Sequence, residues 1–124
     1  MDGPREERFD VDFAVQLSWQ VGTAVRRVAA RCVNLSASGA RLETRDPVPS
    51  GTTVLVYSEL FGRMGLAVVK YCNRDALKHE IGISFGVSLQ LSDPARRRIL
   101  EGLIRTREVV EPVPEPVKVM LIKR

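Results

Sequence analysis

Residues 11–21 read VDFAVQLSWQV, and every second side chain in this stretch is apolar. The apolar positions are Val11, Phe13, Val15, Leu17, Trp19 and Val21. Successive side chains of a strand point to opposite faces, so a period of two over this length indicates one buried and one exposed face. We therefore predict a long strand over residues 11–21, with Trp19 on the side of the core.

Five further segments with strand patterns follow this stretch, and polar or glycine-containing turns separate them. They cover residues 24–35, 40–44, 53–60, 63–71 and 81–85. The loop at residues 46–51 holds two prolines and a glycine, which interrupt a strand ladder. Six short strands with tight turns and no intervening helix indicate an all-β fold, either an antiparallel barrel or a sandwich.

The pattern changes to a helical period after the last strand. Ser92, Asp93 and Pro94 have the side chains of a helix start, and apolar residues recur at helical spacing over residues 99–104. We predict a helix over residues 92–107 that packs on the barrel or on a partner.

The two ends of the chain differ from its centre in composition. Pro112, Pro114 and Pro116 favour an extended spacer, and the apolar residues 117–122 could pair as an extra strand. Residues 1–10 are polar and are predicted to form a flexible arm. The predicted organisation is an arm at 1–10, a barrel at 11–91, a helix at 92–107 and a proline-rich tail at 108–124.

The composition indicates a single domain that is mildly basic. The chain has 124 residues, which is enough for one core without disulfide bridges. Its formal net charge is +4, and its isoelectric point is about 9.5. This charge suits a small anionic ligand and gives little support for binding to long nucleic acid.

The residues of metal sites and catalytic triads are scarce in this sequence. His79 is the only histidine and no Cys-x-x-Cys pair is present, so we expect neither a metal site nor a redox site. Cys32 and Cys72 lie in apolar strand patterns and are predicted to be reduced and buried. We find no apolar leader and no run approaching the roughly 20 apolar residues of a membrane span, so we expect a cytoplasmic protein.

The sharpest local motif is Asn34-Leu-Ser-Ala-Ser-Gly39, which falls at the turn between two predicted strands. Asn, Ser and Gly commonly cap backbone groups at an ordinary turn, and the six residues alone favour that interpretation. The surrounding sequence supports a second interpretation, in which the motif is part of a binding site. Two arginines, Arg5 and Arg8, precede the first strand, and the segment Ile81-Gly-Ile-Ser-Phe85 follows much later.

This order of motifs resembles the PilZ domain family. The family pattern is an arginine pair before the first strand, an Asp or Asn, Ser and Gly motif after the second, and a late Gly-Ile/Val-x-Phe strand. The resemblance spans about residues 4–85, and the helix at 92–107 matches the one that usually follows the barrel. It implies a six-stranded antiparallel β-barrel that acts as a receptor for cyclic di-GMP, with no catalysis and no cofactor.

The resemblance implies a role for each motif residue. The planar forks of Arg5 and Arg8 would bond a guanine edge or a phosphate and stack on a base. Asn34 would accept from a guanine N–H, and Ser36 would offer its hydroxyl to a guanine or a phosphate. Gly39 would permit a positive φ and a close backbone approach.

Four other arginines lie on strands near the proposed site. They are Arg26, Arg27, Arg31 and Arg41. Each has the ordinary interpretation of a charge on the barrel surface, and any of them could replace a missing arginine of the motif. We include Arg41, which lies two residues after Gly39, among the predicted ligand-binding residues.

One departure from the family pattern supports an alternative. The family's arginines are usually four residues apart, whereas Arg5 and Arg8 are three apart and so point to opposite sides of an extended arm. Glu6 and Glu7 between them would repel phosphates. The alternative is a degenerate barrel that binds no nucleotide and acts as a protein–protein interaction domain through its helix and tail.

A third possibility is a basic barrel that binds single-stranded nucleic acid. Such proteins usually display aromatic side chains for base stacking, but aromatic residues make up only 6% of this chain and mostly fall on inward faces. We therefore rank this possibility last. No Ser/His/Asp set or paired-carboxylate arrangement is evident, so the sequence predicts a binding module and not an enzyme.

Overall fold

The computed structural model describes residues 6–104 of the chain. It contains six strands and one helix: β1 (Arg8–Val21), β2 (Ala24–Ser36), β3 (Gly39–Thr44), β4 (Thr53–Ser58), β5 (Gly62–Asp75), β6 (Lys78–Phe85) and α1 (Pro94–Leu103). Two predictions fall outside the described residues, namely the ligand-binding role of Arg5 and the tail at 108–124.

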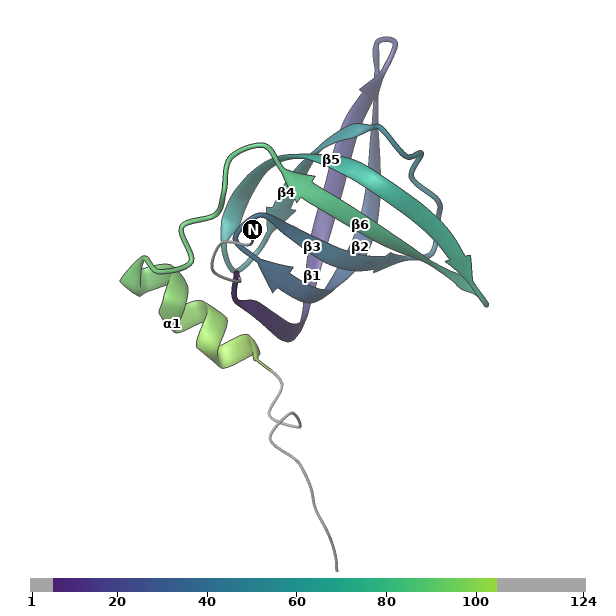
Figure 1. Cartoon of the computed structure of the whole chain (residues 1–124). Coiled ribbons are helices and arrows are strands. Elements are labelled where there is room, and N and C mark those ends of the chain that lie inside the picture. The colour runs from purple at the N-terminus through teal and green to yellow at the C-terminus, as the bar shows by residue number, and fades with distance from the viewer. Residues whose placement is uncertain (1–5, 105–124) are drawn as a thin grey trace, which may run out of the picture.

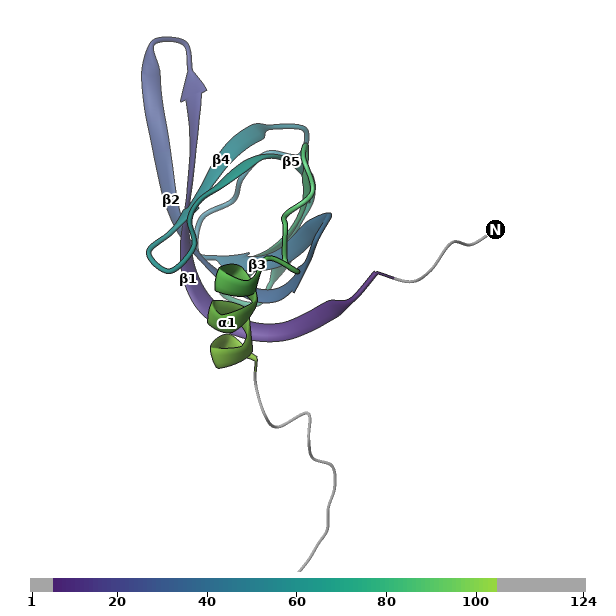
Figure 2. The same cartoon turned by 90° about the vertical axis from the view of Figure 1, so that its left-hand side faces the viewer.

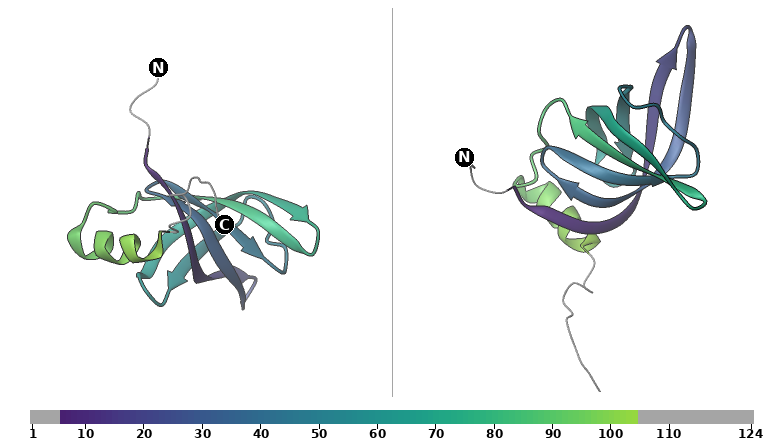
Figure 3. Two further views of the ribbon diagram at one scale, coloured as in Figure 1. Left: turned by 90° about the horizontal axis from the view of Figure 1, so that it is seen from below. Right: turned by 45° about the vertical axis from the view of Figure 1, so that its right-hand side comes forward.

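The six strands close into a barrel in the order β1-β2-β3-β6-β5-β4, and every neighbouring pair is antiparallel. The predicted all-β barrel is confirmed, and the alternative of a sandwich is wrong. Figures 1 and 3 show that β1 and β2 extend past the barrel as a two-stranded ribbon, whose tip carries Gly22 at φ 62°.

The alternating apolar residues of β1 from Val11 to Leu17 face the interior, as predicted, whereas Val21 at the end of the strand is exposed. Val11 and Leu17 are 0% exposed, and the ring of Phe13 lies 5.5 Å from that of Phe61, measured between centroids. Each such side chain contributes roughly 1.5–3 kcal/mol when it is fully buried. Trp19 is only half-buried because the ribbon leaves the barrel at this point, although it still packs against the core.

The two cysteines differ in burial, which corrects half of the prediction. Cys32 is 1% exposed in the core, whereas Cys72 is half-buried. Burial raises the pKa of the Cys32 thiol to about 12, although a hydrogen bond to the Asn34 backbone acts in the opposite direction. Cys72 lies in the part of β5 that continues toward solvent, where the side chains on both faces are partly exposed.

The β5–β6 hairpin is longer than the sequence pattern predicted. Residues 73–78 are predicted to be a polar turn, but β5 runs to Asp75 and β6 begins at Lys78. The turn is confined to Ala76, at φ 59°, and Leu77. Polar side chains are tolerated on these strands because this end of the hairpin lies in solvent.

Bulges interrupt the strand registers at two points that matter for function. The β2–β3 register shifts between Cys32 and Asn34, and the β5–β6 register shifts between Val69 and Tyr71. A bulge inserts one extra residue and changes the direction of the following side chains, and bulges are common next to functional sites. Lys70 and Tyr71, which are adjacent in sequence, are therefore both exposed.

Helix α1 begins two residues later and ends earlier than predicted. Asp93, not Ser92, is the N-cap, and its carboxylate accepts a hydrogen bond of 3.2 Å from the Arg96 backbone N–H. The helix ends at Leu103 because Ile104 adopts an extended conformation and pairs with Val11 of β1. Within residues 6–104, no helix has the length and apolar character needed to cross a membrane.

Candidate functional site

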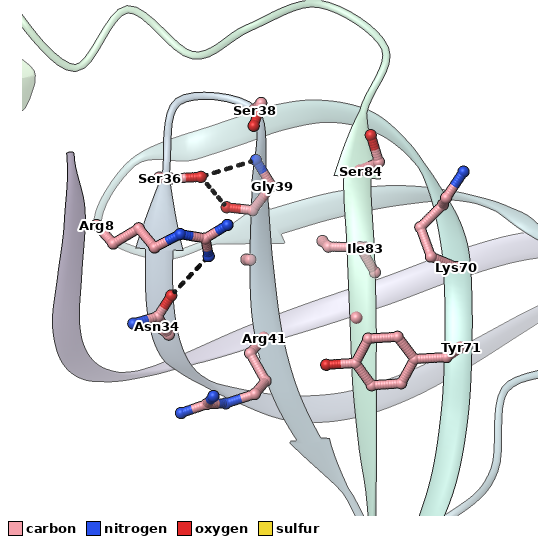
Figure 4. Close-up of a pocket in the computed structure, with 12 residues that line it drawn as sticks. Arg8, Asn34, Ser36, Ser38, Gly39, Arg41, Lys70, Tyr71, Ile83 and Ser84 are labelled. Atoms are coloured by element: carbon pink, nitrogen blue, oxygen red, sulfur yellow. Dashed lines mark hydrogen bonds between the residues drawn. The ribbon is translucent and has the colours of Figure 1, made fainter. Parts of the chain in front are cut away.

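The outer face of the barrel carries a hollow of about 280 Å³ whose lining residues come mainly from five strands, β1, β2, β3, β6 and β5. It is lined by Arg8, Asn34, Ser36, Ser38, Gly39, Ala40, Arg41, Lys70, Tyr71, Gly82, Ile83 and Ser84. Figure 4 shows arginine and asparagine side chains on one side of this pocket and the Tyr71 ring on the other. The five predicted site residues within the described part of the chain all lie here.

Strand register explains why residues so far apart in sequence meet in this pocket. Asn34 pairs with Arg41 across β2 and β3, and Arg41 pairs with Gly82 across β3 and β6. Gly82 pairs with Tyr71 across β6 and β5. One row of the sheet therefore carries an amide, a guanidinium, a glycine and a phenol in succession.

The β2–β3 corner, residues 34–39, forms one end of the pocket. The Ser36 hydroxyl is 3.2 Å from both the N–H and the C=O of Gly39, so it accepts from the first and donates to the second. Ser36 is only 1% exposed. Its hydroxyl therefore holds the turn closed, in addition to its position in the pocket lining.

Gly39 is required at this corner because the backbone of β6 lies against it, and not because of its φ angle. It is absent from the residues with positive φ, so the predicted left-handed backbone is wrong. A Cβ atom at Gly39 would instead overlap the carbonyl oxygen of Ile83 on β6. The glycine therefore allows β3 and β6 to approach beneath the pocket.

Arg8 reaches the same corner from the first residue of β1. Its backbone pairs with Ser36, and its Nη1 donates to the Asn34 Oδ1 at 3.5 Å. The Asn34 Nδ2 donates to the Asp10 Oδ1 at 3.3 Å, which orients the amide. Arg8 was predicted to lie on a flexible arm, but it belongs to a strand, because pairing with β2 extends β1 by three residues toward the N-terminus.

The β5 wall, formed by Lys70 and Tyr71, is the part of the pocket that sequence reasoning missed. The Tyr71 ring covers Gly82, where a Cβ atom would overlap it. The Tyr71 hydroxyl donates to the Glu80 carboxylate at 3.2 Å. The only signal in the sequence was the break in alternation after Val69, which places two long side chains in succession on the exposed side.

Charged groups on both sides of the pocket affect the Tyr71 hydroxyl. Burial and the neighbouring Glu80 raise the pKa of Tyr71, whereas the charges of Arg41 and Arg8 act to lower it. Both guanidinium groups are therefore near enough to the Tyr71 hydroxyl to affect its pKa. With the ammonium of Lys70, three cationic side chains line one hollow.

The other candidate arginines do not line this pocket. Arg31 forms an ion pair with Asp12, and Arg27 lies on the ribbon opposite Ser18. Arg26 lines a separate hollow near Trp19. No group of three or more His, Cys, Asp or Glu side chains in residues 6–104 is arranged to hold a metal ion.

Comparisons with known proteins agree with the barrel fold. The family model of the PilZ domain matches residues 4–105. The solved structure of the PilZ domain with c-di-GMP of YcgR from Escherichia coli is similar, with a TM-score of 0.52 and 15% sequence identity. That match covers 87% of this chain and 95% of the other. No curated protein matches the chain. The match over residues 4–105 places this chain in the PilZ domain family.

Proposed function

We propose that this chain is a receptor module for cyclic di-GMP that changes a protein-interaction surface when it binds the ligand. The observation that carries the proposal is that Arg8, Asn34, Ser36, Gly39 and Arg41 gather in one pocket. PilZ domains are binding modules rather than enzymes, and the related YcgR domain was solved with c-di-GMP.

The pocket offers partners for both chemical parts of the ligand. Arg8, Arg41 and Lys70 supply positive charge for the two phosphates, and a guanidinium fork can bond a phosphate or a guanine edge in bidentate fashion. The exposed face of Tyr71 suits stacking on a guanine base. The Asn34 amide suits a guanine edge once Arg8 turns from its oxygen to the ligand.

The position of Arg41 supports the presence of a second guanidinium at the site. A guanidinium binds phosphate or a guanine edge through its planar fork, and Arg8 supplies one such group. Arg41 lies across the corner on β3, in register with Asn34, and faces the same hollow. We propose that Arg41 acts with Arg8 as a second arginine of the site.

Isothermal titration calorimetry with cyclic di-GMP tests this proposal. A hydrogen bond to a charged group contributes about 1.5–3 kcal/mol, so Arg8→Ala should weaken binding about 10- to 100-fold. The matched control is Arg27→Ala, which removes the same charge from the exposed ribbon and should leave the affinity unchanged. No heat with the wild-type protein at high ligand concentration would rule out the receptor function.

A protein–protein interaction domain remains the second candidate, and one observation favours it. Leu66 and Val87 are 59% and 81% exposed, and with Met64 and Leu89 they line an apolar hollow of about 520 Å³ away from the pocket. Clustered exposed apolar side chains are typical of interaction sites. The same titration separates the two candidates, because a domain that has lost the receptor function binds no nucleotide.

A further inference from the structure

The segment that leads into β1 presents two different faces. Glu6 contacts the corner, where its carboxylate accepts a hydrogen bond of 2.6 Å from Ser38, and Arg8 contacts Asn34. Glu7 and Phe9 contact helix α1 instead. Alternate residues of an extended chain share a face, so a contact that holds Glu7 and Phe9 also sets the direction of Arg8.

A single side chain, Arg97 of α1, makes both helix contacts. Its Nη1 lies 3.3 Å from the Glu7 carboxylate, and its Cζ lies 5.0 Å from the centroid of the Phe9 ring. An i,i+4 ion pair with Glu101, at 3.4 Å, holds the Arg97 side chain on the helix. The Arg97 side chain is only one-third exposed.

The helix also holds β1 at a second point. Ile104 pairs with Val11, and Leu100 is fully buried in the core. β4 pairs with β1 only over Gln16–Ser18, so α1 adjoins a part of β1 that β4 does not reach. Figures 1 and 2 show α1 beside the start of β1. The strand that carries Arg8 is thus anchored by β2 on one side and by α1 on the other.

We propose that Arg97 is a positioning residue for ligand binding: it anchors Glu7 and Phe9 and so directs Arg8 into the pocket. This inference rests on the proposed receptor function. Arg97 does not line the ligand pocket itself, and it acts only through the strand that carries Arg8. Because Arg8 is at the first position of β1, where strands fray, its direction needs an anchor of this kind.

The anchor couples the ligand to the helix in both directions. If a docked α1 favours ligand binding, the ligand must favour a docked α1 by the same factor. Ligand binding at Arg8 is therefore transmitted along one residue of strand to Arg97 and the exposed face of α1. This gives the module a surface that responds to the ligand without any movement of the barrel.

Calorimetric titrations of four variants test the inference. A cation–π contact and a partly exposed ion pair are each modest, so Arg97→Ala should weaken cyclic di-GMP binding about three- to tenfold. Phe9→Leu removes only the aromatic ring and should also weaken cyclic di-GMP binding. Arg98→Ala removes the same charge from an exposed position of the same helix and should have no effect. Arg8→Ala combined with Arg97→Ala should bind no more weakly than Arg8→Ala alone.

A second readout needs no ligand and distinguishes positioning from simple loss of charge. In free protein, Arg97→Ala should speed amide hydrogen exchange at residues 8–10 relative to Arg98→Ala, while exchange in the barrel core stays unchanged. Equal affinity losses from Arg97→Ala with and without Arg8, or unchanged exchange at residues 8–10, would overturn the inference and leave the receptor function intact. If the wild-type protein does not bind cyclic di-GMP, both the positioning role of Arg97 and the receptor function are contradicted.

Discussion

The pocket has two sides that arise in different ways. The β2–β3 corner is built by neighbours in sequence, and its polar groups are satisfied by one another, as in the Ser36–Gly39 contacts. The β5 wall is built by the register of two distant strands, and its side chains Lys70 and Tyr71 face solvent. The corner therefore supplies a rigid frame, whereas the wall supplies surface that a ligand can cover.

The contrast between the corner and the wall shows that one binding site can combine a local sequence motif with a feature of the whole sheet. The motif at the corner consists of six consecutive residues, and it could be recognised once the arginines before the first strand and the late strand at 81–85 were considered with it. The wall depends on a bulge at Lys70, whose effect appears only when β5 pairs with β6. Changes at the corner should therefore disturb folding as well as binding, and changes at the wall should disturb binding alone.

The largest difference is expected in the reactivity of the two cysteine thiols, each of which lies next to one side of the pocket. Cys32 lies two residues before Asn34 in the core, whereas Cys72 directly follows Tyr71 and is half-buried. The thiolate is the reactive form, and a pKa of about 12 for Cys32 leaves almost none of it near neutral pH. Alkylation at pH 8 should therefore modify Cys72 at least about a thousandfold faster than Cys32, because opening the core costs about 5 kcal/mol or more.

The same shift predicts how stability depends on pH. Because folding raises the pKa of Cys32 from 9.0 to about 12, its contribution is complete below pH 9 and is lost progressively as the pH rises toward 12. Urea denaturation of wild type and of Cys32→Ala across this pH range measures how the free energy of unfolding of each depends on pH.

In the alkylation experiment, similar labelling rates for the two thiols in native protein would contradict the burial of Cys32 beneath the corner.

A methyl group at the corner should have the next largest effect. Gly39→Ala places a Cβ atom against the Ile83 carbonyl oxygen, so β3 and β6 must separate. Overpacking of this kind costs roughly 1–3 kcal/mol, and the free energy of unfolding should fall by about that amount with a parallel loss of ligand affinity. The control is Gly102→Ala, where no atom lies within 4 Å and the helix should be unaffected or slightly more stable. Unchanged stability in Gly39→Ala would mean that the corner is not the rigid frame described.

Changes at the β5 wall should alter binding without altering stability. Tyr71→Ala removes a stacking surface that contributes about 1–3 kcal/mol per base, so affinity for cyclic di-GMP should fall at least about fivefold. Tyr71→Phe keeps the ring over Gly82 and should bind within about twofold of wild type, since it loses only the exposed hydrogen bond to Glu80. Calorimetry with matched thermal melts measures both quantities. Equal losses in the two variants would show that the hydroxyl, and not the ring, is the group that matters.

The sequence predicted the fold and the corner because both depend on local patterns. Alternation over residues 11–21 identified β1, and the motif at Asn34, Ser36 and Gly39 identified the turn that closes one end of the pocket. Arg8 was placed on an arm because charged residues give no alternation signal, and only the pairing with Ser36 makes its position part of a strand. Lys70, Tyr71 and Arg97 could not be found, since their roles depend on a bulge and on helix docking.

Mapping of amide chemical shifts by NMR during a cyclic di-GMP titration tests the central claim most directly. We expect saturable shifts at Asn34 and Gly39 of the corner and at Tyr71 of the wall, while Gly22 at the tip of the ribbon stays unchanged. Shifts on both sides of the pocket at one ligand concentration would show that the corner and the wall form a single site. No shifts at saturating ligand, or the largest shifts on the ribbon, would contradict it.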